Sequence, residues 1–573
     1  MMLSSLGASG TLAALFFCAS SVRATVTDYV IVGGGTGGLA LANRLTENPR
    51  VSVLVLEAGG DGLGNVNISD LALVGASWGT DVDWQFPTET LPVPPGRNIG
   101  KVPRGKVLGG SSAINGAVYT RGDTRDFVQW AALGNPSWGP TDFFAASFKN
   151  EEFFPPPKNW SIDYIYSDHG HNGLLPTSFG NPAPPIQDAI INSVVAYGGR
   201  HSLDNEGGHP DGVAWATHAR LPSNATRATS ATGYYFPFSY RKNFQVKLFS
   251  QATRIIWKST RGTPVAAGVE YVDQNGNTQV ANATTVVLCG GVWGSPPILE
   301  RSGVGNKTLL ASLGIKSVVD LPGVGENMVE QTAAPMVYAF NTTLPLDSVT
   351  PLLLNGESLQ ETFTKGGDLA KLESLFVKPD NMAEPIFQAY QKLYQQGTTW
   401  VVGLTNLIQQ PGQPTLLAWF GGVARPLSSG SCHITSSDGL AYPAVQYNWF
   451  TSEFDIYAAS VTLQRIHNFT TVPPLSDWIS ARIAPPPNVT SLDDIGTYFI
   501  ENCVQGDHPI GTAAMIPRQD GGVVDNNLKV YGTANVYVVD ASVMPFQPTG
   551  YPHAHVYAIA ERAAELFKAQ KHY

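Results

Sequence analysis

The chain has 573 residues, of which 43% are hydrophobic and only 14% carry a formal charge. This composition excludes an intrinsically disordered protein, which needs low hydrophobicity and high charge, and the length favours at least two domains. The formal net charge of −10 would repel a phosphate backbone, so we expect no nucleic-acid partner.

The first 24 residues have the pattern of a secretory signal peptide. A short apolar run at 12–19 is followed by small residues that end at Ala24 in an A-x-A-like cleavage pattern. A membrane anchor would need roughly 20 apolar residues, and neither this run nor a later one is that long. We therefore predict a signal peptide at 1–24, a secreted or secretory-lumen protein, and no membrane span.

Glycan acceptor motifs and the cysteine count agree with this route. Cleavage after residue 24 removes Cys18 and leaves three cysteines, so at most one disulfide can form and a cysteine-based metal site is not expected. N-x-S/T triplets predict N-glycosylation on surface loops. They begin at Asn67, Asn159, Asn224, Asn282, Asn306, Asn341, Asn468 and Asn488.

Residues 28–57 are predicted to form one strand–helix–strand unit. The run 29–32 is β-branched and aromatic, as in a buried parallel strand. A helix is predicted over 39–45 and a second strand over 51–56. A G-x-G-x-x-G motif fills the turn between the first strand and the helix.

Each position of this motif suits a phosphate-binding turn. Gly33 permits the tight turn, Gly35 the close approach of a pyrophosphate, and Gly38 close helix packing. The helix N-terminus at Thr36 and Gly37 supplies free N–H groups for phosphates.

An acidic residue in the expected place strengthens this prediction. Glu57 ends the second strand about 20 residues later, where its carboxylate can accept hydrogen bonds from ribose hydroxyls. The unit therefore predicts a dinucleotide site. Its residues alone leave NAD and FAD open, because both cofactors use the same fingerprint.

The rest of the chain predicts an α/β fold with a second domain inserted into the first. Apolar strands at 285–288 and 536–539 and a helix at 556–568 are typical of a Rossmann-type fold. The middle is rich in proline and aromatic residues and is expected to be an α+β substrate domain. The predicted boundaries are 25–335 for the FAD-binding domain with some substrate-domain segments, 336–505 for mainly substrate domain, and 506–573 for the return to the first domain.

Three further segments carry a family resemblance. The sequences at 105–115, 291–305 and 321–327 resemble the signatures of the glucose-methanol-choline (GMC) oxidoreductases, and the likeness spans 28–568. It implies an FAD-dependent enzyme acting on alcohols, related to aryl-alcohol oxidases and glucose oxidase. The resemblance places Ala252 by the adenine, and Asp540 and Ala541 at the far edge of the flavin ring. Residues implied near the ring are Gly109, Gly110, Ser111, Asn115 and Gly116.

The segment 506–515 resembles the catalytic histidine motif of this family. An alcohol releases hydride readily only as its proton leaves, so the site needs a base, and imidazole qualifies. We predict that His508 is this base. The position that is His or Asn in most relatives is Tyr551 here, whose hydroxyl can still donate a hydrogen bond. His553, two residues on, is the alternative second partner, and both remain open.

Two other motifs do not indicate a functional site. Ser77 lies in a G-x-S-x-G sequence, but no strand–turn–helix of the hydrolase kind surrounds it. His169 and His171 lack further spaced ligands, so we interpret them as solvent-facing and predict no metal.

Together these inferences predict a secreted alcohol oxidase. The expected substrate is a primary aryl, furanic or allylic alcohol, and the expected electron acceptor is dioxygen or a quinone. A role in fungal secondary metabolism, such as patulin-like mycotoxin synthesis, is among those that the family resemblance implies. The alternative is a flavin-containing, non-redox cyclase of the versicolorin B synthase type. Oligomeric state is left open.

Overall fold

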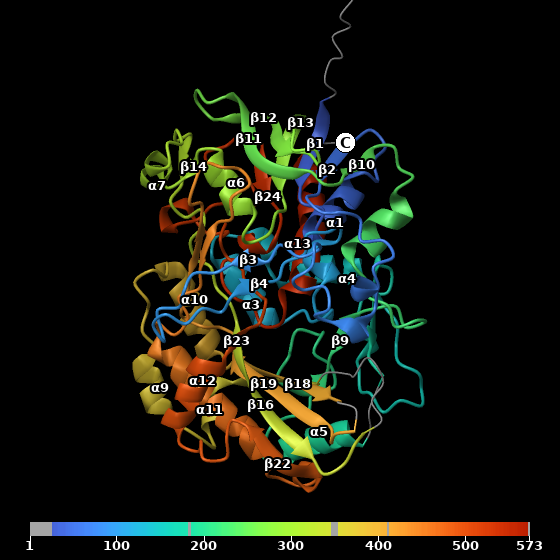
Figure 1. Ribbon diagram of the computed structural model, residues 1–573, viewed down its shortest axis with the longest axis vertical. Helices are drawn as coiled ribbons and strands as arrows, with labels where there is room; N and C mark the ends of the chain where they lie inside the picture. The colour runs from blue at the N-terminus through green and yellow to red at the C-terminus, as the bar shows by residue number, and fades with distance from the viewer. Residues whose placement is uncertain (1–25, 182–184, 345–352, 410–411, 571–573) are drawn as a thin grey trace, which may run out of the picture.

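The computed structural model describes residues 26–181, 185–344, 353–409 and 412–570. Two large sheets lie at opposite ends of the molecule, and segments from distant parts of the chain fill the space between them (Figure 1). The predicted signal peptide lies outside the described residues.

The first sheet is a Rossmann-type parallel sheet, as predicted. Its strand order is β10-β2-β1-β13, β24 pairs with the C-terminal end of β13 on the side away from β1, and all these neighbours run parallel. Two antiparallel strands, β12 and β11, extend it beyond β13. The bounds are β1 (Thr27–Val32), β2 (Val53–Leu56), β10 (Phe244–Lys247), β11 (Gln251–Ser259), β12 (Val265–Val272), β13 (Thr278–Leu288) and β24 (Val536–Val538).

Helices α1 (Thr36–Leu45), α4 (Pro140–Asn150) and α13 (Pro552–Gln570) pack beside this sheet. The side chain of Arg44 on α1 donates to the buried carboxylate of Glu561 on α13 at 2.8 Å. The last helix therefore returns the C-terminal end of the chain to the first strand–helix unit. Both α1 and α13 begin earlier than the apolar pattern predicted, because their first turns, TGG at 36–38 and PHAH at 552–555, contain no large apolar side chain.

The second sheet is antiparallel and belongs to the other end of the molecule. Its strand order is β22-β16-β19-β18-β17-β8, and β23 pairs with the start of β16. Strand β8 precedes the middle of the chain, so the sheet is assembled from separate segments. The bounds are β8 (Gly212–Trp215), β16 (Thr332–Phe340), β17 (Leu353–Ser358), β18 (Thr399–Ile408), β19 (Leu416–Val423), β22 (Ile479–Ala484) and β23 (Val504–Gln505).

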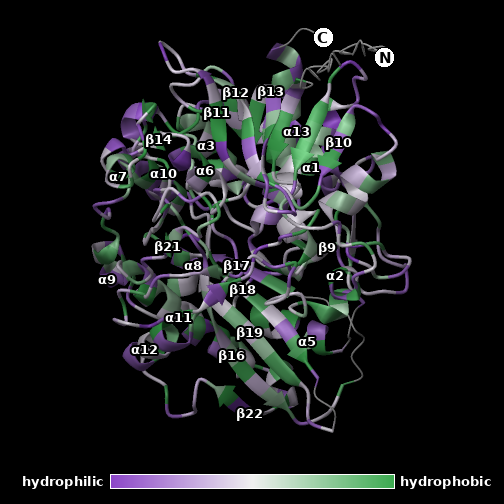
Figure 2. Cartoon of the chain, turned by 45° about the horizontal axis from the view of Figure 1, so that its top comes forward, coloured by the Kyte–Doolittle hydropathy of each residue, from purple (hydrophilic) through white to green (hydrophobic). Residues whose placement is uncertain are grey.

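Helix α11 (Glu453–Thr470) covers one face of this second sheet. Strand alternation on β19 puts Trp419 and Gly421 toward the helix, where a Cβ on Gly421 would lie 2.2 Å from Ile466. Phe420 therefore points to the opposite face. Figure 2 shows that hydrophobic residues gather on the strands of both sheets.

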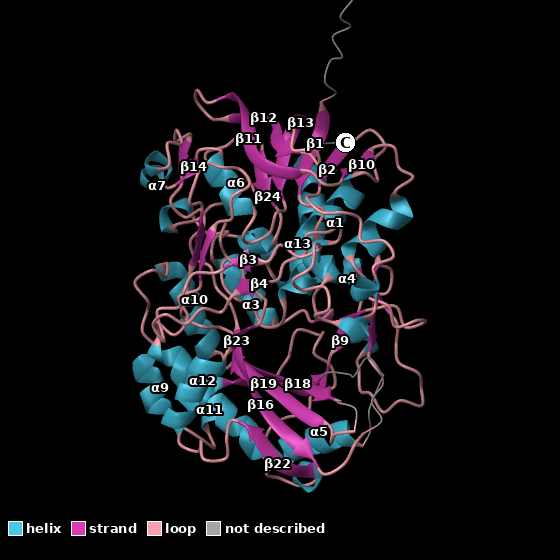
Figure 3. Ribbon diagram, viewed as in Figure 1, coloured by secondary structure: helices cyan, strands magenta, loops and turns pink. Residues whose placement is uncertain are grey.

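The remaining elements connect and cover these two sheets (Figure 3). The smaller sheets are formed by β5 (Val118–Tyr119), β9 (Thr217–Ala219), β7 (Leu175–Phe179) and β6 (Glu151–Phe153), and by the pairs β3 (Phe86–Pro87) with β4 (Lys101–Val102), β14 (Val304–Gly305) with β15 (Val319–Asp320), and β20 (Ser431–His433) with β21 (Ala444–Gln446). The other helices are α2 (Val66–Ser69), α3 (Thr124–Ala132), α5 (Ile186–Ala196), α6 (Ser295–Arg301), α7 (Lys307–Ser312), α8 (Leu359–Phe363), α9 (Leu369–Leu375), α10 (Glu384–Gln395) and α12 (Leu492–Asn502).

The structure corrects two sequence-based predictions about surface residues and describes the helices and cysteines more exactly. His169 is buried and lies between Glu151 and Asp204 at 3.2 and 3.0 Å, so the interpretation as solvent-facing is wrong. Asn468 is not on a loop: it lies within α11 and donates to the hydroxyl of Tyr197 at 2.9 Å. No helix in the described part of the chain is long and apolar enough to span a membrane. The cysteines of the described ranges are buried and unpaired; they are Cys289, Cys432 and Cys503.

Candidate active site

A cavity of about 640 Å³ extends from the turn after β1 to the uncovered face of the second sheet. Its lining includes most of the residues predicted from the sequence. They are Gly33, Gly35, Thr36, Gly37, Glu57, Gly110, Ser111, Asn115, Gly116, Ala252, His508, Asp540, Ala541, Tyr551 and His553. Gly38 and Gly109 do not line the cavity, but each shapes its wall.

The glycine turn is held by contacts that exclude a side chain. Gly33 has a φ of +103°, and a Cβ there would lie 2.4 Å from the carbonyl oxygen of Cys289, which directly follows the neighbouring strand β13. A Cβ on Gly38 would lie 2.0 Å from the carbonyl oxygen of Gly33. Helix α1 therefore starts close against the sheet, with Gly35 as a cap that offers no side-chain hydrogen bond. Its first N–H groups face the cavity as a site for an anion.

A second glycine segment meets this turn. The backbone N–H of Gly109 donates to the carbonyl oxygen of Gly34 at 2.8 Å. A Cβ on Gly110 would lie 2.7 Å from Cα of Gly35, so only glycine permits this approach. Gly35 and Gly109 are 74 residues apart in the sequence. Their two segments nevertheless form one continuous backbone wall of the cavity.

Glu57 holds the turn as well as lining the cavity. Its two carboxylate oxygens accept the backbone N–H groups of Gly34 and Gly59, each at 2.8 Å. Burial raises the pKa of Glu57 to about 7, although these N–H groups and Lys106 oppose the shift. The remaining lone pairs of this carboxylate are available to a ribose hydroxyl.

Asp540 uses its carboxylate for structure. One oxygen accepts from the N–H of Gly291 and the hydroxyl of Ser295, at 2.9 and 2.6 Å, and the other accepts from the N–H and hydroxyl of Ser542. Asp540 thus joins the C-terminal turn to the start of α6.

His508 has a defined tautomer. Its Nδ1–H donates to Oε1 of Gln331 at 2.9 Å, and Nε2 of Gln331 donates to the carbonyl oxygen of Ala424 at 3.1 Å, which fixes the orientation of the amide. Nε2 of His508 is therefore the unprotonated nitrogen available to a cavity ligand. Burial, with the charge of Arg104 adding to it, lowers the pKa of His508 to about 3.

The two alternatives for a second partner differ in their contacts. The ring of Tyr551 stacks on His508 with centroids 4.3 Å apart. His553 donates from Nδ1 to the carbonyl oxygen of Val118 at 3.3 Å, and its buried Nε2 has no hydrogen-bond partner among the described residues. Tyr551 is thus the one placed beside the predicted base.

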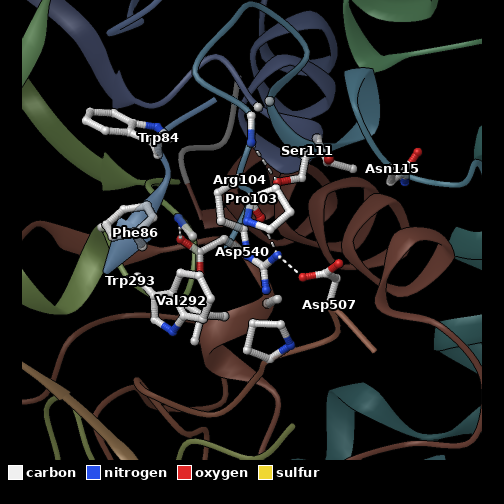
Figure 4. A pocket seen from close by; sticks show the side chains of 18 of the residues that line it. Trp84, Phe86, Pro103, Arg104, Ser111, Asn115, Val292, Trp293, Asp507 and Asp540 are labelled. Carbon is white, nitrogen blue, oxygen red and sulfur yellow. Dashed lines mark hydrogen bonds and ion pairs between the residues drawn. The ribbon is translucent and has the colours of Figure 1, made fainter. Parts of the chain in front are cut away.

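Sequence reasoning missed a charged group on the wall beside His508. The guanidinium of Arg104 forms an ion pair with Asp507 at 3.2 Å and lies 4.2 Å from the ring centroid of Trp293 (Figure 4). The backbone N–H of His508 donates to the buried carboxylate of Glu330 at 2.9 Å. Arg104 and Glu330 therefore hold the loop that carries His508. Arg104, Glu330 and Gln331 reach this loop through tertiary contacts, which a local sequence motif does not predict.

The rejected motifs show structural roles. The hydroxyl of Ser77 donates to the carbonyl oxygen of Asn67 at 3.0 Å and is buried. His169 belongs to a buried network that includes the Arg121–Glu151 ion pair. Within the described ranges, no group of three or more His, Cys, Asp or Glu side chains is arranged to hold a metal ion.

Comparison with known proteins identifies the family. GMC oxidoreductase family models match residues 27–333 and 426–560. The chain belongs to the GMC oxidoreductase family. It is 34% identical to the GMC oxidoreductase family protein Mala s 12 of Malassezia sympodialis, over 94% of this chain and 92% of that protein.

Solved structures agree with this assignment. An FAD-dependent oxidoreductase from Chaetomium thermophilum is similar with a TM-score of 0.86 and 27% identity, covering 95% of this chain and 100% of that one. A fungal aryl-alcohol oxidase is similar with a TM-score of 0.84 and 25% identity, covering 95% and 99%. The predicted family and its cofactor are confirmed: the protein is an FAD-dependent oxidoreductase acting on CH–OH donors.

The residues present fit FAD. The cap of α1 leaves N–H groups for a pyrophosphate, and the Gly35–Gly110 approach leaves a wall without side chains. Glu57 and Ala252 line the cavity at the sheet, whereas His508 and Tyr551 line it beside the second sheet. One cavity thus has the uncapped start of α1 in its wall and titratable groups beside the second sheet.

Proposed function

We propose that this flavoenzyme oxidises a primary aryl, furanic or allylic alcohol to the aldehyde, with His508 as the base and dioxygen as the electron acceptor. The observation that carries the proposal is the hydrogen bond from His508 to Gln331, because it leaves Nε2 unprotonated at the cavity. An alcohol oxygen placed against that nitrogen can lose its proton as its carbon loses hydride.

The proposed reaction removes one hydride and one proton from the alcohol, and each has an acceptor in the site. FAD, when bound, supplies the acceptor for the hydride at N5 of its ring. Nε2 of His508 takes the hydroxyl proton, so the substrate loses one proton and one hydride and its C–O bond becomes a carbonyl. The hydroxyl of Tyr551, beside His508, is placed to donate a hydrogen bond to the substrate oxygen. Dioxygen then takes two electrons and two protons and leaves as hydrogen peroxide.

Apolar side chains of the second sheet that line the cavity support an apolar substrate. Val402 and Leu404 of β18 and Phe420 of β19 line the cavity, and Leu404 and Phe420 are directly opposite in the strand register. These half-buried side chains favour a ring or an unsaturated chain over a sugar, whose hydroxyls would lose water without finding partners.

The proposal extends to location and role. The leader pattern at 1–24 and the N-x-S/T triplets support a secreted, glycosylated protein, and soluble nicotinamide acceptors are scarce outside the cytosol. Secretion thus favours dioxygen. The unusual Tyr551 supports a specialised alcohol of fungal secondary metabolism.

Anaerobic mixing of the FAD-loaded enzyme with a panel of alcohols tests the proposal. We expect loss of the flavin's visible absorbance with aryl, furanic or allylic alcohols, and hydrogen peroxide release once air is admitted. Product formed without bleaching would support the cyclase alternative instead. Bleaching by sugars but not by apolar alcohols would contradict the substrate class.

A further inference from the structure

Arg227 is a buried cation at the wall of the cavity. Its side chain is 3% exposed, and its Nε donates to the carbonyl oxygen of Ile68 at 2.8 Å. Its Nη1 donates to the backbone carbonyl of Asn115 and, at 2.9 Å, to Oδ1 of the same residue. Asn115 lines the cavity (Figure 4). Asn115 therefore connects the guanidinium of Arg227 to the space where the flavin ring is expected.

A second arginine adds to this charge. Arg220 is 2% exposed, lies opposite Arg227 in an antiparallel bridge, and donates from Nη1 to the carbonyl oxygen of Phe179 at 2.8 Å. Neither guanidinium has a carboxylate within 4.0 Å among the described residues. Other buried arginines do: Arg121, Arg425 and Arg465 pair with Glu151, Asp126 and Glu357.

The nearby histidines do not change this balance. His218 and His553 are buried, and burial, together with the charge of Arg227, lowers the pKa of each to about 4. Both rings are thus neutral near pH 7. A pair of unneutralised guanidinium groups in a protein interior is costly, because hydrogen bonds to carbonyls do not cancel the charge.

Hydrogen bonds to Arg227 and Ala117 fix the orientation of the Asn115 side-chain amide. Its Oδ1 accepts from Arg227 and from the backbone N–H of Ala117, at 2.9 Å each. The oxygen is therefore occupied on the protein side, and the NH₂ group is the part left for a ligand in the cavity.

We propose that Arg227, supported by Arg220, is a positioning residue that stabilises the negative charge which reduction adds to the flavin. It acts through Asn115, whose NH₂ it directs to the ring, and through its own uncompensated field. Positive charge near the ring raises the flavin's reduction potential and its affinity for nucleophiles that leave negative charge on the ring. This inference rests on bound FAD and not on the proposed alcohol oxidation.

Sulfite provides a probe that involves no alcohol. It adds through a sulfur electron pair to N5, the displaced ring electrons leave negative charge on the flavin, and no external oxidant or reductant is needed. The experiment measures the sulfite dissociation constant by bleaching, and the flavin midpoint potential against reference dyes, on FAD-loaded enzyme. The variants are Arg227→Met, Arg227→Lys and Arg220→Met. The control is Arg200→Met, which removes an equal charge from a side chain that is 61% exposed.

We expect Arg227→Met to weaken sulfite binding about tenfold. The flavin midpoint potential should fall by about 30 mV, which is a tenfold change in equilibrium constant for a two-electron couple. Arg227→Lys should stay within about threefold of the parent, Arg220→Met should shift both quantities in the same direction by less, and Arg200→Met should shift neither. An Arg227→Met protein that binds FAD with parental potential and sulfite affinity overturns the proposal. If that variant does not retain FAD, Arg220→Met decides: a weakened sulfite affinity supports the proposal, and an unchanged one overturns it.

Discussion

His508 and Gln331 are 177 residues apart in sequence and joined by a 2.9 Å hydrogen bond from Nδ1 to Oε1. The amide is itself oriented by its donation to Ala424. A neutral imidazole has one N–H, so fixing it on Nδ1 determines which nitrogen can accept the substrate's proton.

Replacing Gln331 by methionine should therefore slow the reaction without emptying the site. The Gln331→Met change keeps the length of the side chain but removes the acceptor, so either tautomer of His508 could form. We expect flavin reduction by alcohol to slow about tenfold with FAD still bound. Gln331→Glu keeps an acceptor and should recover most of the rate, while its carboxylate should raise the pKa of His508. Rapid-mixing absorbance measures all three proteins, and a parental rate in the methionine variant would show that the tautomer is fixed by something else.

Removing the side chain of the proposed base, His508, should have a larger effect. His508→Ala leaves the glycine turn and Glu57 untouched, so FAD should stay bound. The rate of flavin reduction is expected to fall about 100-fold or more, the scale of a lost general base. Flavin content from the visible spectrum is the control. Reduction at nearly the parental rate would remove His508 from the mechanism.

Tyr551 and His553 can be separated by substitutions that keep their packing. Tyr551→Phe keeps the ring that stacks on His508 and removes only the hydroxyl. We expect about a tenfold loss in the rate of flavin reduction, the size of a lost hydrogen bond to substrate. His553→Asn keeps a donor toward Val118 and should cost less than about threefold, because the hydrogen bond of His553 goes to a backbone carbonyl and not to His508. The reverse order of effects would assign the second role to His553.

Features that the sequence predicts well depend on local contacts. The turn at Gly33 and the placement of Glu57 follow from one short motif, because a dinucleotide site needs glycines beside the pyrophosphate and an acidic residue about 20 residues later for the ribose. The groups around His508 are not local: Gln331, Glu330 and Arg104 reach it only through the folded chain. The sequence wrongly places His169 on the surface, because a short polar segment gives no sign of the two carboxylates that surround this ring.

The pH dependence of flavin reduction should lack a limb near the ordinary histidine pKa. Burial, helped by Arg104, lowers the pKa of His508 to about 3, so the ring stays neutral down to that pH. Protonation blocks the base, and activity should be lost only as pH falls toward about 3. Rates of flavin reduction from about pH 4 to 8, corrected for the folded fraction, are expected to be nearly constant. An apparent pKa near about 6.5 in these rates would contradict the buried, neutral ring.

His433 should stabilise the fold in the opposite pH range. It lies between Glu300, 2.7 Å from Nδ1, and Glu326, 3.2 Å from Nε2. Burial alone would lower its pKa, but the hydrogen bonds and charges of the two glutamates outweigh that and raise it to about 9. The folded state thus holds a proton that the unfolded state releases above its pKa of about 6.5. Stability from this residue is complete below about pH 6.5 and is lost as pH rises through about 9.

The measurement that checks this is the free energy of unfolding of the parent and of His433→Asn across that range. We expect the variant to be less stable by about 2 kcal/mol near pH 6, after allowing for partial solvent screening, and the difference to shrink as pH approaches about 10. His209→Asn, at an exposed position, is the matched control and should show no such trend. A difference that stays constant over this pH range would mean that His433 contributes packing rather than charge, since packing of a neutral ring does not depend on its proton.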